Sequence, residues 1–83
     1  MKTLTQFGLM AEAHWRQFLP RMTAHLEATG QLQTLLREAE AKTEEEMDEL
    51  RRHFLIHRLT PEQAHQRAWE MVRERYLLLP PES

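Results

Sequence analysis

The stretch HRLTPEQAHQRAWEMVRERY, residues 57–76, decides the fold because it contains both a helix break and a helix start. Thr60 is a favoured capping residue, Pro61 suits the first helical position, and Gln63 completes a capping box with Thr60. We therefore expect a helix over residues 61–78. Its inner face is predicted to comprise Ala64, Ala68, Met71 or Val72, and Tyr76, with Trp69 on the flank.

The segment before this break predicts a longer helix over residues 31–57. Its apolar stripe recurs at steps of three and four residues and comprises Leu32, Leu35, Leu36, Ala39, Thr43, Met47, Leu50 and Phe54. Gly30 precedes this helix, and glycine readily adopts the left-handed conformation that closes many helices at their C-terminus. We therefore place a turn at Gly30.

The first 28 residues carry another helical pattern, and this one contains a proline. The apolar residues recur in steps of three and four and are Leu4, Phe7, Ala11, Trp15, Phe18, Met22 and Leu26. Pro20 removes a backbone hydrogen bond and clashes with the preceding turn, yet the stripe keeps its phase across it. We therefore expect one helix over residues 5–28, kinked at Pro20.

Together these segments predict an all-α fold, a three-helix antiparallel bundle that forms one domain over residues 1–83. Short turns join the helices, and short turns favour antiparallel neighbours. Residues 79–83 form a tail, because Pro80 disfavours helical geometry at the residue before it. The leucines at 77–79 should fold back on the bundle or cover a partner. A chain this short buries a small core, so dimerisation is a further way to complete it.

The composition excludes several classes of chemistry. Cysteine is absent and the only serine is Ser83, so the sequence supplies no plausible nucleophile for acyl transfer. It contains no glycine-rich phosphate loop, no apolar run long enough to span a membrane and no signal-peptide pattern. We therefore expect a cytoplasmic protein that is not an enzyme and uses no cofactor.

The net charge of −2 is unevenly distributed along the chain. Residues 38–50 hold seven acids and one lysine, whereas residues 51–75 hold six arginines and three glutamates. These arginines are the candidates for nucleic-acid contacts: Arg51, Arg52, Arg58, Arg67, Arg73 and Arg75. However, Glu62, Glu70 and Glu74 interrupt the outer face of the last helix, and carboxylates face a phosphate backbone unfavourably. We therefore favour charge pairing within the chain or across a dimer, and keep a small DNA-associated regulator as the alternative.

One metal-binding pattern occurs, at Glu49, His53 and His57, which recur at four-residue spacing on one helix face. Two histidines at this spacing can both reach a zinc ion, but a stable site needs three or four converging ligands. Histidines near a helix C-terminus also have a structural explanation, because the helix dipole favours a cationic imidazole there. We expect no native metal site, and these three residues are its weak candidates.

Aromatic side chains are the best candidates for large apolar contacts. They dominate the energetics of many cores and are enriched at the most sensitive positions of protein interfaces. The expected anchors, in the core or at an interface, are Trp15, Phe18, Phe54, Trp69 and Tyr76.

Two stretches resemble small orphan proteins encoded by phages, prophages and transposons, such as the TnpV-like family. They are HWRQFLPRMTAHLEATGQLQTLLREAEAKTEEEMDEL (residues 14–50) and LTPEQAHQRAWEMVRERYLLLPPE (residues 59–82). The shared features are Trp15, Leu26, Gly30, Leu32, the acidic helix, Ala64, Ala68, Trp69, Val72 and the Leu-Pro-Pro-Glu end. This resemblance implies a mobile-element accessory protein without catalytic residues. We expect a small helical module that acts by binding protein, in which homodimerisation is an option and nucleic acid is the less favoured partner.

Overall fold

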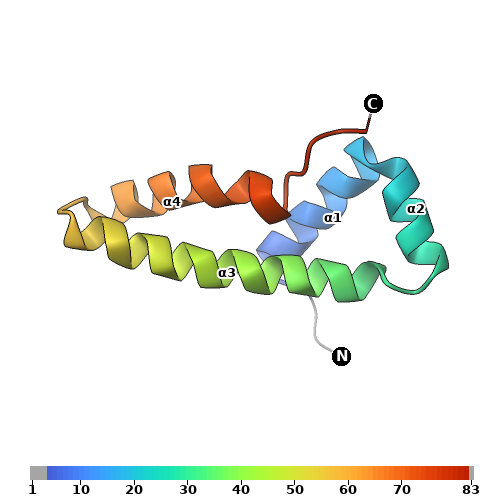
Figure 1. Cartoon of the computed structure of the whole chain (residues 1–83), viewed down its shortest axis with the longest axis horizontal. Coiled ribbons are helices and arrows are strands. Elements are labelled where there is room, and N and C mark those ends of the chain that lie inside the picture. The colour runs from blue at the N-terminus through green and yellow to red at the C-terminus, as the bar shows by residue number, and fades with distance from the viewer. Residues whose placement is uncertain (1–3, 83) are drawn as a thin grey trace.

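The computed structural model describes residues 4–82, and this range consists of helices and connections without strands. In chain order the helices are α1 (Gln6–Phe18), α2 (Pro20–Ala28), α3 (Leu32–Ile56) and α4 (Pro61–Tyr76). Figure 1 shows α4 returning antiparallel along the C-terminal half of α3, whereas α1 and α2 lie toward the other end. The all-α prediction is confirmed. The predicted domain extends to residues 1–3 and 83, which lie outside the described residues.

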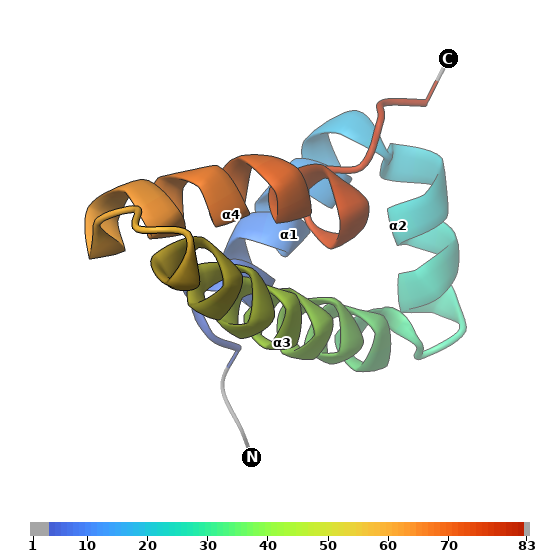
Figure 2. The ribbon, with the colours of Figure 1, turned by 60° about the vertical axis from the view of Figure 1, so that its left-hand side comes forward.

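The prediction of one kinked helix over residues 5–28 is wrong, because the chain forms two helices with a break at Leu19. Leu19 has φ −130° and ψ 53°, outside the helical region, and Pro20 begins α2. Proline disfavours helical geometry at the residue before it, and at the first position of a helix its missing N–H is not needed. Figure 2 shows the chain turning sharply between α1 and α2. The predicted three-helix bundle is therefore an arrangement of four helices.

The other two helices follow the prediction closely, and their ends have clear causes. The capping box is present: Gln63 N donates to Thr60 Oγ1 (3.2 Å), and Thr60 N donates to Gln63 Oε1 (3.1 Å). Gly30 has the predicted left-handed φ of 73°, and Arg58 closes α3 with a φ of 70°. Helix α3 ends at Ile56, one residue before its predicted end. Helix α4 ends at Tyr76, two residues before its own predicted end.

The core consists of two groups of buried side chains. The first joins α1, α2, the N-terminal half of α3 and the tail, and comprises Ala11, Trp15, Leu19, Leu26, Leu32, Leu36, Ala39 and Leu77. The second joins α3 to α4 through Met47, Ala68 and Val72. Of the two alternatives predicted on α4, Val72 is fully buried, whereas Met71 is 42% exposed. Ala64, Ala68 and Val72 therefore form the inner face of α4, and Met71 does not belong to it.

The leucines that follow α4 fold back on the bundle, as one of the two predicted alternatives requires. Leu77 is fully buried, and its carbonyl oxygen accepts a hydrogen bond of 2.9 Å from Trp15 Nε1. The carbonyl oxygen of Leu79 lies 2.7 Å from His14 Nε2. The tail therefore satisfies the indole N–H that burial of Trp15 would otherwise leave without a partner.

The tail also caps α2 through Glu82. The Glu82 carboxylate accepts hydrogen bonds from Arg21 N (3.1 Å) and Met22 N (3.0 Å), and Glu82 N donates to Phe18 O (3.0 Å). The residue that precedes α2, Leu19, provides no side-chain cap of its own. Because the first N–H groups of a helix lack partners within the helix, Glu82 replaces the missing local cap.

The described part of the chain is thin, with principal extents of 46, 33 and 14 Å. Packed helices lie about 8–10 Å apart, so the shortest extent accommodates no more than two stacked helices. Each helix consequently keeps one face open. None of the described helices combines the length and apolar content that crossing a membrane requires.

Candidate protein-binding site

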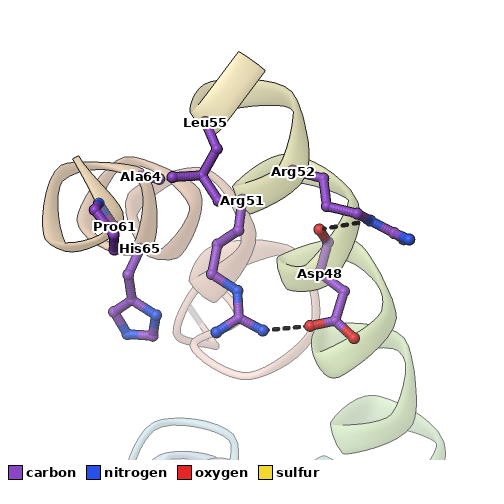
Figure 3. A pocket seen from close by; sticks show the side chains of 7 residues that line it. All are labelled: Asp48, Arg51, Arg52, Leu55, Pro61, Ala64 and His65. Carbon is purple, nitrogen blue, oxygen red and sulfur yellow. Dashed lines mark hydrogen bonds and ion pairs between the residues drawn. The ribbon is translucent and has the colours of Figure 1, made fainter. Parts of the chain in front are cut away.

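A cleft lies between the last turns of α3 and the first turns of α4, where the helix break brings the two helices together (Figure 3). Its volume is about 420 Å³. The lining residues are Asp48, Arg51, Arg52, Leu55, Pro61, Ala64 and His65. We refer to this feature as the hairpin-end cleft.

The hairpin-end cleft combines exposed apolar side chains with a structural reason for their exposure. Leu55 lines the cleft and is 45% exposed, and the neighbouring Ile56 is 79% exposed. The side of α3 that packs with α4 is occupied along its length by Met47, Leu50 and Phe54. Leu55 and Ile56 lie off this side of α3, so Leu55 is only partly covered and Ile56 is almost entirely open to solvent.

The polar side of the cleft is slightly basic. Arg51 forms an ion pair with Asp48, and Figure 3 shows the Arg51 and His65 side chains directed to the same side. Arg52 points away from them, and its Nε donates to Asp48 O (3.3 Å). Two arginines against one aspartate give a formal charge of +1 with His65 neutral. The N-terminus of α4 adds a partial positive charge from its dipole, so the cleft favours a carboxylate.

The predicted anchors differ in position. Trp15 is 4% exposed and belongs to the core. Trp69 is partly buried and stacks on Phe7 at a centroid distance of 5.6 Å, which joins α4 to α1. Phe54 is partly buried against the α3–α4 core. Phe18 is 38% exposed, so it is the most accessible of these four side chains.

Tyr76, the fifth predicted anchor, is partly buried beside charged groups. Lys42 Nζ lies 5.9 Å from the centre of its ring. Hydrogen bonding with the Glu46 carboxylate, followed by burial, raises the pKa of the Tyr76 phenol above its ordinary value. Arg75 pairs with Glu46 at 2.5 Å, so these four residues join the end of α4 to the middle of α3.

The six candidate arginines differ in their surroundings, and only Arg51 and Arg52 line the hairpin-end cleft. Arg51 and Arg75 are paired with Asp48 and Glu46. Arg73 Nε is buried. Arg58 lies in the turn after α3. Arg67 is exposed on α4, where it lines a surface hollow with Gln66 and two carboxylates, Glu62 and Glu70. Three of these arginines, Arg51, Arg67 and Arg75, thus have carboxylates beside them, whereas nucleic-acid binding typically uses a basic face.

The candidate metal ligands are only partly brought together. The rings of His53 and His57 lie 4.5 Å apart between centroids. Within residues 4–82, no three histidine, aspartate or glutamate side chains form a group that could hold a metal ion. Glu49 therefore does not complete a site with the two histidines.

Comparison with known proteins finds no matching family model, no curated relative and no similar solved structure. The resemblance to mobile-element proteins stays a prediction.

Five cleft residues were not among the predicted site residues: Asp48, Leu55, Pro61, Ala64 and His65. A usable signal exists in the sequence, because Leu55 and Ile56 fall outside the apolar stripe of α3. The apolar stripe of an amphipathic helix faces the core, so apolar residues outside that stripe are expected on the solvent-exposed side of the helix.

Proposed function

We propose that this chain is a non-enzymatic protein-binding module whose contact surface is the hairpin-end cleft. The observation that carries the proposal is the exposure of Leu55 and Ile56, at 45% and 79%, beside a cleft with a basic rim. Apolar side chains next to each other on a surface, bordered by charged groups, are typical of interaction sites.

The chemistry of the cleft defines the partner segment. A volume of about 420 Å³ accommodates one or two side chains rather than a folded domain. Its apolar wall of Leu55, Pro61 and Ala64 suits an aliphatic or aromatic side chain, while Arg51 and His65 suit a neighbouring carboxylate. We therefore infer that the partner inserts an apolar side chain that is flanked by an acidic residue, in the manner of a helix laid in a groove.

The test is capture of partners from native-host lysate on the immobilised chain, with and without nuclease, followed by mass spectrometry. Leu55→Gln replaces the largest apolar side chain of the cleft wall with a polar one and keeps a good helix former in α3. The matched control is Leu9→Gln, which makes the same change at a leucine that is 56% exposed on α1. Circular dichroism of both variants verifies their helical content.

We expect the wild-type chain to capture a protein partner whether or not the lysate is treated with nuclease. The Leu9→Gln variant should capture the same partner, and the Leu55→Gln variant should not. Equal retention by the two variants would exclude the hairpin-end cleft as the contact surface. Recovery that disappears with nuclease would favour the DNA-associated alternative and direct attention to Arg58 and Arg67.

A further inference from the structure

The tail after α4 is attached to the rest of the chain at two levels that differ in burial. Leu77 is fully buried and its carbonyl oxygen accepts a hydrogen bond from Trp15 Nε1, so this residue belongs to the core. Residues 80–82 are exposed, as are the hydrogen bonds of the Glu82 carboxylate. Segments with few buried contacts open locally at low cost. Residues 79–82, which we name the distal tail, can therefore detach while Leu77 stays in place.

The distal tail lies on α1 and α2 as an extended peptide lies on a receptor (Figure 2). The Glu82 carboxylate accepts hydrogen bonds from two backbone N–H groups in the first turn of α2, and Glu82 N donates to Phe18 O (3.0 Å). At the other end of the segment, the carbonyl oxygen of Leu79 lies 2.7 Å from His14 Nε2. These contacts use main-chain groups and one carboxylate, which any extended segment with an acidic side chain can supply.

A hollow of about 240 Å³ lies beside the distal tail, and Leu79 forms one of its walls without filling it. The other walls include Trp15 of α1, Met22 of α2 and Leu35 of α3. Met22 joins the hollow to the carboxylate contact, because its N–H donates to Glu82 and its side chain lines the hollow. A larger apolar side chain at the place of Leu79 would bury more apolar surface and bind more tightly.

We propose that this surface is a second peptide-binding site, which the distal tail occupies and shields. Its external ligand is an extended segment of another protein, with an aromatic side chain at the place of Leu79 and a glutamate three residues later at the place of Glu82. Prolines between the two, as in the tail, restrict the backbone, so the segment loses little conformational freedom on binding. The ring fills the hollow that Leu79 leaves open, which favours the external segment over the tail.

The attached tail sets a threshold for binding. It competes at an effective concentration in roughly the millimolar range, so segments that only equal its contacts are excluded. Loss of the Glu82 carboxylate removes a helix cap, whose typical strength corresponds to about a fivefold change in an equilibrium constant. The apparent affinity of a site is reduced by the fraction of molecules in which it is closed. An external segment should therefore bind Glu82→Ala about fivefold more tightly than wild type.

Peptide titration of the ¹⁵N-labelled full chain, followed at the amide resonances of Arg21 and Met22, tests the site. The probe is the acetylated and amidated peptide LFPPE, the tail sequence 78–82 with phenylalanine in place of Leu79. In Glu82→Ala the two N–H groups lack the tail carboxylate, and the probe should move both resonances toward their wild-type positions. The matched control peptide LFPPQ lacks the carboxylate and should not restore them.

Two further comparisons examine the hollow and the displacement of the tail. LLPPE should bind more weakly than LFPPE, because it leaves the hollow open. In wild type, LFPPE should accelerate hydrogen exchange at Glu82 N, which leaves Phe18 O when the tail is displaced. Glu74→Ala, a change at an exposed glutamate of α4, is the matched control variant and should bind LFPPE as wild type does.

Three results would overturn the proposal. Unchanged Arg21 and Met22 resonances in Glu82→Ala, at a probe concentration of about 10 mM that exceeds the effective concentration of the tail, would exclude the site. Equal effects of LFPPE and LFPPQ would exclude recognition of the carboxylate. Equal affinities of wild type and Glu82→Ala would exclude shielding by the tail. The hairpin-end cleft has no lining residue in common with the hollow, so these outcomes are independent of partner capture by the cleft.

Discussion

Removal of the Glu82 carboxylate should destabilise the fold, although this residue lies at the far end of the chain from the helix that it caps. Glu82 accepts hydrogen bonds from the backbone N–H groups of Arg21 and Met22, and α2 has no other side-chain cap. Glu82→Ala leaves both N–H groups to water. It also removes the negative charge from the positive end of the α2 dipole.

The size of the effect follows from these contacts. Loss of a helix N-cap costs about 1 kcal/mol, within a range of roughly 0.5–2. Both hydrogen bonds are solvent-exposed, so the middle of this range applies. An unfolding entropy of about 2.1 cal/mol/K per residue gives roughly 0.17 kcal/mol/K for 83 residues. The melting temperature should therefore fall by about 6 °C.

The assay is thermal unfolding followed by circular dichroism, at two protein concentrations so that association can be separated from folding. Glu74→Ala is the control, because Glu74 is exposed and lies outside every contact described above; a change of less than about 0.5 kcal/mol is expected for it. Equal melting temperatures for wild type and Glu82→Ala would refute the capping of α2 by the tail.

Three further predictions concern local features. Thr60→Ala should cost about 1 kcal/mol in urea unfolding because it removes the capping box of α4; an unchanged midpoint would contradict this. Arg58→Gly should raise the free energy of unfolding by about 1 kcal/mol, because Arg58 holds a left-handed φ of 70° that glycine adopts freely; loss of stability would contradict the strain. Because the folded pKa of Tyr76 is raised above 10.0, the unfolded chain loses this proton first, so stability should fall as pH rises from about 10 through the folded pKa. An absorbance titration of the phenol checks this, and Glu46→Gln should move its midpoint downward.

Local sequence signals predicted the features that depend on a few neighbouring residues. Thr60, Pro61 and Gln63 define the start of α4 because all of their interactions lie within one turn. Gly30 defines the end of α2 for a similar reason, since its φ of 73° is accessible to few other residues. The leucines after α4 were expected to be covered because their exposure together is costly.

The apolar pattern of the sequence did not predict the features that depend on contacts between distant residues. The apolar stripe continues across Pro20 and therefore suggested one helix, yet the chain tolerates a break because Glu82 caps the second helix from 60 or more residues away. Val72 and Met71 occupy neighbouring positions on α4, and only tertiary packing selects Val72 for the core. The hairpin-end cleft likewise requires the pairing of α3 with α4 before its two walls meet.

The binding of a purified partner to wild type and to Leu55→Gln, compared by calorimetric titration, tests the proposed function most directly. We predict that Leu55→Gln weakens binding about tenfold or more, equivalent to about 1.4 kcal/mol, whereas Leu9→Gln binds as wild type does. Equal affinities for all three proteins would contradict the assignment of the hairpin-end cleft as the protein-binding surface.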